Sequence, residues 1–147
     1  MALAERHADV VWTGNLTQGS GTITAGSGAL TDLPVTFASR TEQSNGKTSP
    51  EELIAAAHAT CFAMVMANAL NQAGTPPEQL NVTATCTLDR IDGKLTITTM
   101  QLDVRGRVPG VDEATFKQVA ENGGHDCPVS RALANNVAIT VNATLEG

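Results

Sequence analysis

Aromatic residues and positive charges are both scarce in this sequence. Its 147 residues include no Tyr, one Trp and three Phe, so Val, Leu, Ile, Ala and Met must build the core. Nine Lys and Arg stand against fifteen Asp and Glu, which gives a net charge of −6. A chain without a basic surface has nothing to neutralise phosphate groups, so we exclude nucleic-acid binding.

The sequence also lacks the signals of a membrane or secreted protein. We find no apolar run that approaches the roughly 20 residues of a membrane span, so no membrane association is expected. The N-terminal residues do not place an apolar segment after a basic one, which argues against a signal peptide. Three cysteines do not form the even-numbered disulfide framework of a small secreted domain. We therefore expect a cytoplasmic protein, folded as one domain over residues 1–147.

The first forty residues have the alternation and glycine turns of β-structure. We expect strands around Val10–Trp12, over Ser20–Ala25 and over Val35–Arg40. A polar loop then leads to a helix that should run from Ser49 to about Gln72. Ser49 is its N-cap, proline follows at the first helical position, and Glu52 completes an S-x-x-E capping box.

This helix is rich in alanine and apolar almost all round, which predicts a buried central helix. A long hairpin should follow, with its tight turn at Asp92-Gly93 and a bulge near Thr98-Thr99. A second helix should begin at Asp112 and close at Gly123-Gly124. A short third helix from Pro128 and a last strand over Val137–Leu145 complete the order βββ-α-ββ-αα-β. We interpret this order as an α+β fold with antiparallel sheets wrapped around the central helix.

The three cysteines have different settings. Cys86 alternates with Val82, Ala84 and Leu88, so it is expected to pack on the core face of a strand. Cys61 lies inside the alanine-rich helix, one turn after His58. Either it is a packing residue, or it is a reactive thiol that needs a nearby cation, since burial alone would raise its pKa.

Arg40, just before the long helix, is the best candidate for that cation. The simpler alternative is that Arg40 is an exposed arginine at the end of a strand. Cys127 precedes a proline, so it is expected at the N-cap of the short helix, as a packing residue or as a favoured thiolate. Glu51 suits the first helical turn by its charge alone. Glu51 and Cys61 are ten residues apart, about 15 Å along a helix. A common site would need long bridging side chains and loops or a second subunit, and the small helix residues favour the second subunit.

Two segments of the sequence are distinctive: Ser49-Pro-Glu-Glu-Leu-Ile-Ala-Ala-Ala-His-Ala-Thr-Cys61-Phe and Cys127-Pro-Val-Ser-Arg-Ala-Leu. Both resemble the OsmC/Ohr family of peroxide-detoxifying proteins, specifically its OsmC branch. Weaker similarity extends to the strand of Trp12 and to Phe37-Ala-Ser-Arg40.

This resemblance implies an intertwined homodimer that reduces organic hydroperoxides, and hydrogen peroxide less well. It implies that Cys61 is the peroxidatic cysteine, Cys127 the resolving cysteine, Arg40 the activating arginine and Glu51 the acid that positions it. It further implies a Cys61–Cys127 disulfide, which a dithiol such as a dihydrolipoyl protein reduces, with no metal or bound cofactor. We expect an apolar pocket of Phe62, Met64 and Met66 to favour alkyl hydroperoxides.

Two alternatives belong to other functional classes. His58, Cys61, His125 and Cys127 offer four nitrogen and sulfur ligands that zinc would accept, as in a structural metal site. A non-catalytic redox sensor would form the same disulfide without peroxide turnover. Elemental analysis distinguishes the first alternative from a peroxidase, and dithiol-driven peroxide consumption distinguishes the second.

Overall fold

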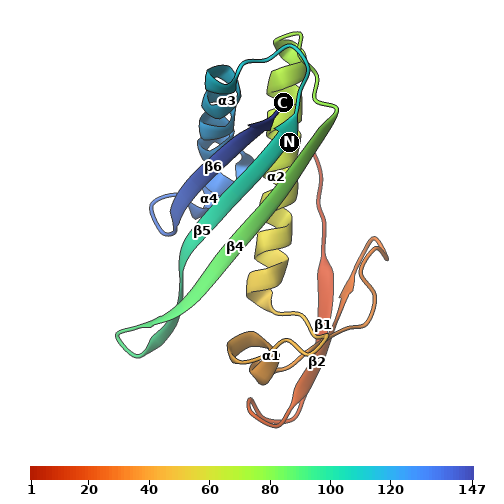
Figure 1. Ribbon diagram of the computed structural model, residues 1–147. Helices are drawn as coiled ribbons and strands as arrows, with labels where there is room; N and C mark the ends of the chain where they lie inside the picture. Colours follow the sequence, from red (N-terminus) through yellow and green to blue (C-terminus); the bar gives the residue numbers. More distant parts are fainter. The chain divides into compact units, whose positions relative to one another are not determined.

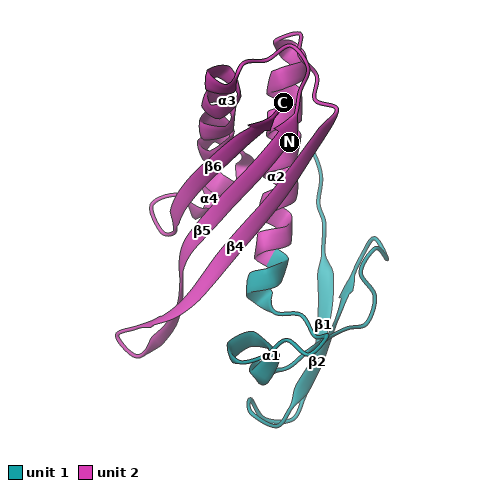
Figure 2. Ribbon diagram, in the orientation of Figure 1, with its two compact units in different colours: residues 1–53 teal, residues 54–147 magenta.

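The computed structural model describes residues 1–147 and divides into two compact units, Met1–Leu53 and Ile54–Gly147 (Figure 2). Six strands and four helices follow one another along the chain: β1 (Ala8–Thr13), β2 (Ser20–Ala25), β3 (Leu33–Val35), α1 (Phe37–Thr41), α2 (Pro50–Gln72), β4 (Gln79–Ile91), β5 (Lys94–Arg107), α3 (Glu113–Asp126), α4 (Pro128–Leu133) and β6 (Ala138–Glu146) (Figure 1). The α+β class is confirmed, with one short helix more than expected. The single-domain organisation stays a prediction.

Unit 1 contains a three-stranded antiparallel sheet in the order β1-β2-β3. The predicted strand Val35–Arg40 is wrong beyond its first residue, because β3 ends at Val35 and α1 follows. Thr36 caps this helix: its hydroxyl accepts the backbone N–H of Ser39 at 3.0 Å, and the Ser39 hydroxyl accepts the N–H of Thr36 at 3.0 Å. This reciprocal capping box turns the chain, so a helix and not a strand presents Arg40.

The long helix α2 has the predicted bounds. The Ser49 hydroxyl accepts the backbone N–H of Glu52 at 3.1 Å, as expected of the N-cap. The Glu52 carboxylate instead accepts the hydroxyl of Thr48 at 2.8 Å, so the predicted capping box is formed by one of its two bonds.

The burial of α2 differs from the prediction of a helix enclosed on all sides. One face is fully buried, through His58, Phe62, Met66 and Leu70 at intervals of four residues. The opposite face is exposed and includes Ala56, Thr60 and Met64. Its alanines nevertheless make α2 apolar on average, so by length and composition this helix could cross a membrane, contrary to our sequence expectation.

Unit 2 contains the sheet β4-β5-β6. The β4–β5 hairpin turns at Asp92 and Gly93, which both have positive φ, and its register shifts where Thr98 is the extra residue. Both features confirm the sequence predictions. The expectation of purely antiparallel sheets is wrong for β6, which pairs with β5 in parallel. The helices α3 and α4 form the crossover that a parallel connection requires.

Helix α3 continues beyond the glycines that were expected to end it. Gly123 and Gly124 are buried inside the helix, which ends at Asp126. A side chain at Gly124 would overlap Val141 of β6, so this glycine permits α3 to pack closely on the strand. Cys127 ends α3 and is at the same time the N-cap of α4.

The buried core of unit 2 joins α2, β5 and α3. Phe62, Met66, Met100, Leu102 and Phe116 are all completely buried in one cluster. This cluster fixes the inner face of α2 and the end of α3, and thereby the positions of Cys61 and Cys127.

Candidate active site

In unit 1 the structure brings Arg40 and Glu51 together. The guanidinium donates from Nε to Oε1 at 2.9 Å and from Nη2 to the same oxygen at 2.8 Å, with a further Nε–Oε2 contact of 3.2 Å. The Arg40 side chain is 31% exposed and that of Glu51 only 8%. Glu51 thus holds the planar guanidinium in one orientation and leaves Nη1 able to donate elsewhere.

Arg40 also lines an apolar pocket of about 410 Å³ within unit 1. Its other walls include Val10, Trp12, Phe37 and Leu53. A cation at the wall of an apolar cavity suits a ligand with one polar end and a hydrocarbon body.

The expected pocket of Phe62, Met64 and Met66 is not formed. Phe62 and Met66 are completely buried in the core, whereas Met64 is 67% exposed on the other side of α2. These residues follow the helical period of 3.6, which separates positions that are close in sequence.

In unit 2 the structure brings Cys61 and Cys127 together. Cys61 is partly exposed and Cys127 is completely buried. Burial raises the pKa of the Cys61 thiol, a hydrogen bond from the Val129 backbone opposes this rise, and the neighbouring Cys127 side chain adds to it. The positive charge of Arg131 also lowers the pKa of Cys61, although the net direction is upward. Within unit 2 alone, Cys61 is therefore favoured as the protonated thiol.

Cys127 takes the N-cap position that the sequence predicts. Its sulfur accepts the backbone N–H of Ser130 at 3.3 Å, and its Sγ lies 3.0 Å from the Ser130 Oγ. The Ser130 Oγ in turn lies 2.6 Å from the Nε2 of His58. Ser130 was not singled out by the sequence analysis, although its place three residues after an N-cap is a signal that could have found it.

The two histidines of the zinc alternative lie in different surroundings. His58 is completely buried, and burial lowers its pKa, whereas His125 has an exposed side chain that lies 3.5 Å from Glu121. No group of three or more His, Cys, Asp or Glu side chains is arranged to hold a metal ion. The zinc alternative therefore has no support from this geometry.

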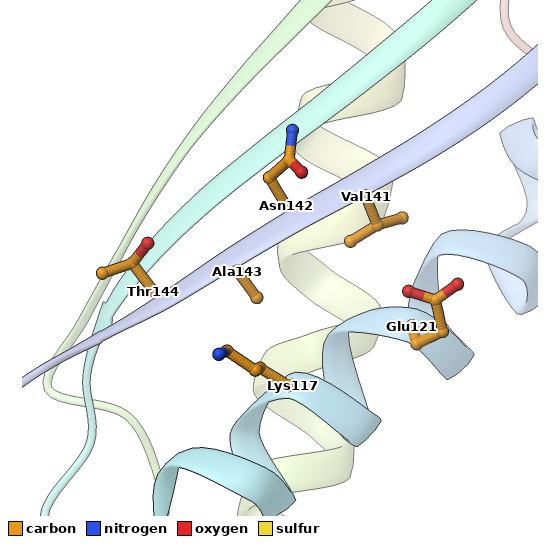
Figure 3. A pocket seen from close by; sticks show the side chains of 6 residues that line it. All are labelled: Lys117, Glu121, Val141, Asn142, Ala143 and Thr144. Atoms are coloured by element: carbon orange, nitrogen blue, oxygen red, sulfur yellow. The ribbon is translucent and has the colours of Figure 1, made fainter.

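Cys86 lies on β4 and packs against the core of unit 2, as the alternation predicts. A separate pocket of about 430 Å³ lies between α3 and β6 and is lined by Lys117, Glu121 and residues 141–144 (Figure 3). None of its lining residues is a cysteine. Among the expected site residues the structure thus forms two pairs, Arg40–Glu51 within unit 1 and Cys61–Cys127 within unit 2.

The sequence matches a known protein family. The sequence model of the family "OsmC-like protein" matches residues 43–142, a range that includes Glu51, Cys61 and Cys127.

Curated relatives agree with this match. The chain is 38% identical to Peroxiredoxin OsmC of Escherichia coli K12 over 128 residues, which cover 87% of this chain and 89% of the relative. It is 30% identical to the organic hydroperoxide resistance protein of Xanthomonas axonopodis pv. citri over 95 residues, 64% of this chain and 65% of that relative.

Solved structures show the same fold. The organic hydroperoxide resistance protein OhrB of Bacillus subtilis superposes with a TM-score of 0.75 at 22% identity, over 94% of this chain and 98% of that chain. An OsmC protein of Legionella pneumophila gives a TM-score of 0.74 at 22% identity, over 98% of this chain and 99% of that chain.

Proposed function

The chain belongs to the OsmC-like protein family, and from this premise we propose that it is a cysteine-based peroxidase that reduces organic hydroperoxides. The observation that carries the proposal is the pairing of two thiols, one partly exposed on α2 and one buried at the start of α4. A partly exposed thiol can meet the peroxide, and a neighbouring thiol can capture the oxidised product.

In the first step, the Cys61 thiolate attacks the distal peroxide oxygen. The O–O bond breaks, an alcohol leaves after taking up a proton, and Cys61 becomes a sulfenic acid. Because burial raises the pKa of Cys61, this step requires a cation that stabilises the thiolate.

We assign that role to Arg40. Its Nη1 can donate to the thiolate and to the developing charge on the leaving oxygen, while Glu51 fixes its orientation through Nε and Nη2. The apolar pocket beside Arg40 supports an alkyl hydroperoxide as substrate in preference to hydrogen peroxide.

In the second step, Cys127 attacks the sulfenic sulfur of Cys61. A disulfide forms and water leaves, which protects Cys61 from further oxidation. An external dithiol, such as a dihydrolipoyl protein, then reduces the disulfide. In the proposed cycle the chain's own residues carry out the two oxidative steps and the external dithiol carries out the reduction, so no step uses a metal or a bound cofactor.

We further propose that the enzyme is an intertwined homodimer in the cytoplasm, associated with neither membranes nor nucleic acid. The exposed, alanine-rich face of α2 supports close packing of two such helices, with its fully buried face retained in the core of unit 2. In such an assembly either subunit can supply the Arg40–Glu51 pair to a given Cys61.

The test combines turnover with identification of the oxidised product. The parent protein should consume an alkyl hydroperoxide with dihydrolipoamide as reductant and should show a Cys61–Cys127 disulfide by mass spectrometry after a peroxide pulse. The Cys127→Ser variant should react once per site, lose sustained turnover and accumulate sulfinic Cys61 in excess peroxide. A parent protein that pairs Cys61 with Cys86, or consumes no peroxide, would refute the proposal.

A further inference from the structure

A hydrogen-bonded chain of three side chains connects α2 to the buried cysteine. The His58 Nε2 lies 2.6 Å from the Ser130 Oγ, which lies 3.0 Å from the Cys127 Sγ. His58 and Cys127 are completely buried, and Ser130 is 1% exposed. The two oxidative steps of the proposed peroxidase reaction use the sulfur of Cys127 but neither His58 nor Ser130.

The direction of these hydrogen bonds follows from which atoms lack partners. Neutral imidazole carries one N–H, and the His58 Nδ1 is buried without a hydrogen-bond partner. A proton on Nδ1 would leave a buried N–H donor unsatisfied, whereas a bare Nδ1 leaves only a lone pair. Proteins rarely bury an unpaired N–H donor, so the proton belongs on Nε2.

With the proton on Nε2, His58 donates to Ser130 and sets the direction of the next bond. The Ser130 hydroxyl has one hydrogen, and its oxygen already accepts from His58, so this hydrogen points to the Cys127 sulfur. The backbone N–H of Ser130 points to the same sulfur at 3.3 Å. The hydroxyl and the backbone N–H of Ser130 thus converge on the Cys127 Sγ, and His58 fixes the direction of the hydroxyl.

We propose that His58 is a positioning residue for the resolving step and acts through Ser130, which contacts the reacting sulfur of Cys127. This inference rests on the proposed peroxidase function and adds to it. Donors that converge on a sulfur stabilise it as an anion, the form that attacks. Burial lowers the pKa of His58, which keeps the imidazole neutral in this role.

The assisted step conserves atoms and electrons. The Cys127 thiol gives up its proton, and its sulfur forms a bond to the sulfenic sulfur of Cys61 while the S–O bond of Cys61 breaks. The hydroxide that leaves takes up a proton and becomes water. Cys127 is oxidised and the sulfenic sulfur is reduced by the same amount, so no further reactant is needed.

This arrangement predicts effects on one step of the cycle. Ser130→Ala removes the hydroxyl but keeps the backbone N–H that reaches Cys127. After a peroxide pulse on the reduced protein, rapid quenching and mass spectrometry should show that sulfenic acid forms on Cys61 at the parent rate. Formation of the Cys61–Cys127 disulfide should be slower by about tenfold or more, the effect of losing one hydrogen bond to a charged group. Sulfinic acid should appear at lower peroxide concentrations than in the parent.

A matched pair at position 58 tests the positioning role. His58→Gln keeps an N–H donor near the place of Nε2, and His58→Met fills a similar volume without one. Disulfide formation should be faster in His58→Gln than in His58→Met. Equal rates in this pair, or parent-rate disulfide formation in Ser130→Ala, would overturn the inference. Equal slowing of sulfenic acid formation and disulfide formation in Ser130→Ala would also overturn it. General disruption of the fold would then be enough to explain the slower reaction.

A spectroscopic measurement tests the hydrogen-bond direction independently of peroxide chemistry. Nitrogen-15 NMR of the reduced protein should show a His58 imidazole protonated on Nε2 and bare on Nδ1. A proton on Nδ1 would overturn the inference even if the protein is an active peroxidase. A parent protein that forms no disulfide with peroxide would instead count against the proposed function. In that case the His58 tautomer measured by NMR would still show whether the hydrogen bonds run from His58 through Ser130 to Cys127.

Discussion

Gly123 and Gly124 in α3 should respond in opposite directions to the same substitution. An added Cβ at Gly123 would lie 3.4 Å from Phe62 Cε2 and 3.5 Å from Met66, which is ordinary van der Waals contact. At Gly124 the added Cβ would overlap the Cγ2 of Val141, on the strand against which α3 packs. Both glycines are buried inside the helix, so the two sites differ mainly in this contact.

The magnitudes follow from two opposing effects. Replacing glycine by alanine in a helix interior stabilises it by about 1 kcal/mol at either position. Overpacking of a buried site costs about 1–3 kcal/mol, and the upper part of this range applies to Gly124 because the β-branched Val141 has little rotamer freedom. We expect Gly123→Ala to stabilise the protein by up to about 1 kcal/mol and Gly124→Ala to destabilise it by about 2 kcal/mol.

Urea unfolding of the two variants measures the effect directly. Helix propensity cancels in the comparison, so their difference of about 3 kcal/mol isolates the contact with Val141. In thermal unfolding, each kcal/mol corresponds to roughly 3 °C for a chain of this size. Val141→Ala should relieve Gly124→Ala in a double-mutant cycle. Equal stability of the two glycine variants would refute the close packing of α3 on β6.

Three further predictions concern the thiols and a helix cap. Cys61→Ser should abolish peroxide turnover and Cys86→Ser should leave it largely intact, and equal loss in two folded variants would contradict the assignment. Arg40→Ala should move the pH midpoint of Cys61 alkylation upward, since burial already raises the pKa of Cys61 and Arg131 would then be the remaining cation that opposes this rise; an unchanged midpoint means that another group activates the thiol. Asp112→Ala should destabilise the protein at neutral pH, because a hydrogen bond from the Thr115 backbone holds the pKa of Asp112 below its usual range. The folded-state pKa of Asp112 is lowered, so its contribution to stability is lost as the pH falls through that pKa. Urea unfolding should therefore show the stability difference between the parent and Asp112→Ala disappearing at low pH.

The sequence predicted the features that depend on a few neighbouring residues. The helix start at Ser49, the turn at Asp92 and the N-cap at Cys127 each depend on side chains that contact their own backbone. The bulge at Thr98 was visible because the apolar alternation changes phase there.

Features that depend on distant packing were missed or wrong. Gly124 was expected to end a helix, but the closeness of Val141 is what requires glycine there. The parallel pairing of β6 depends on where the crossover of α3 and α4 leads, which no local pattern records. The contact between His58 and Ser130 joins residues 72 positions apart and has no signature in either segment. The active-site roles of Arg40, Glu51, Cys61 and Cys127 stay predictions that rest on the family resemblance, because residue spacing alone left their alternatives open.

The parallel strand β6 has a consequence for how the chain acquires its structure. The hairpin β4–β5 closes through a local turn, so it can form soon after it is synthesised. The second edge of β5 stays unpaired until β6 is made, and β6 follows only after the crossover of residues 108–137. During that interval β5, which has one apolar face, presents unpaired backbone groups, the usual template for intermolecular pairing. The nascent chain therefore passes through a stage vulnerable to aggregation, which ends when β6 docks along β5.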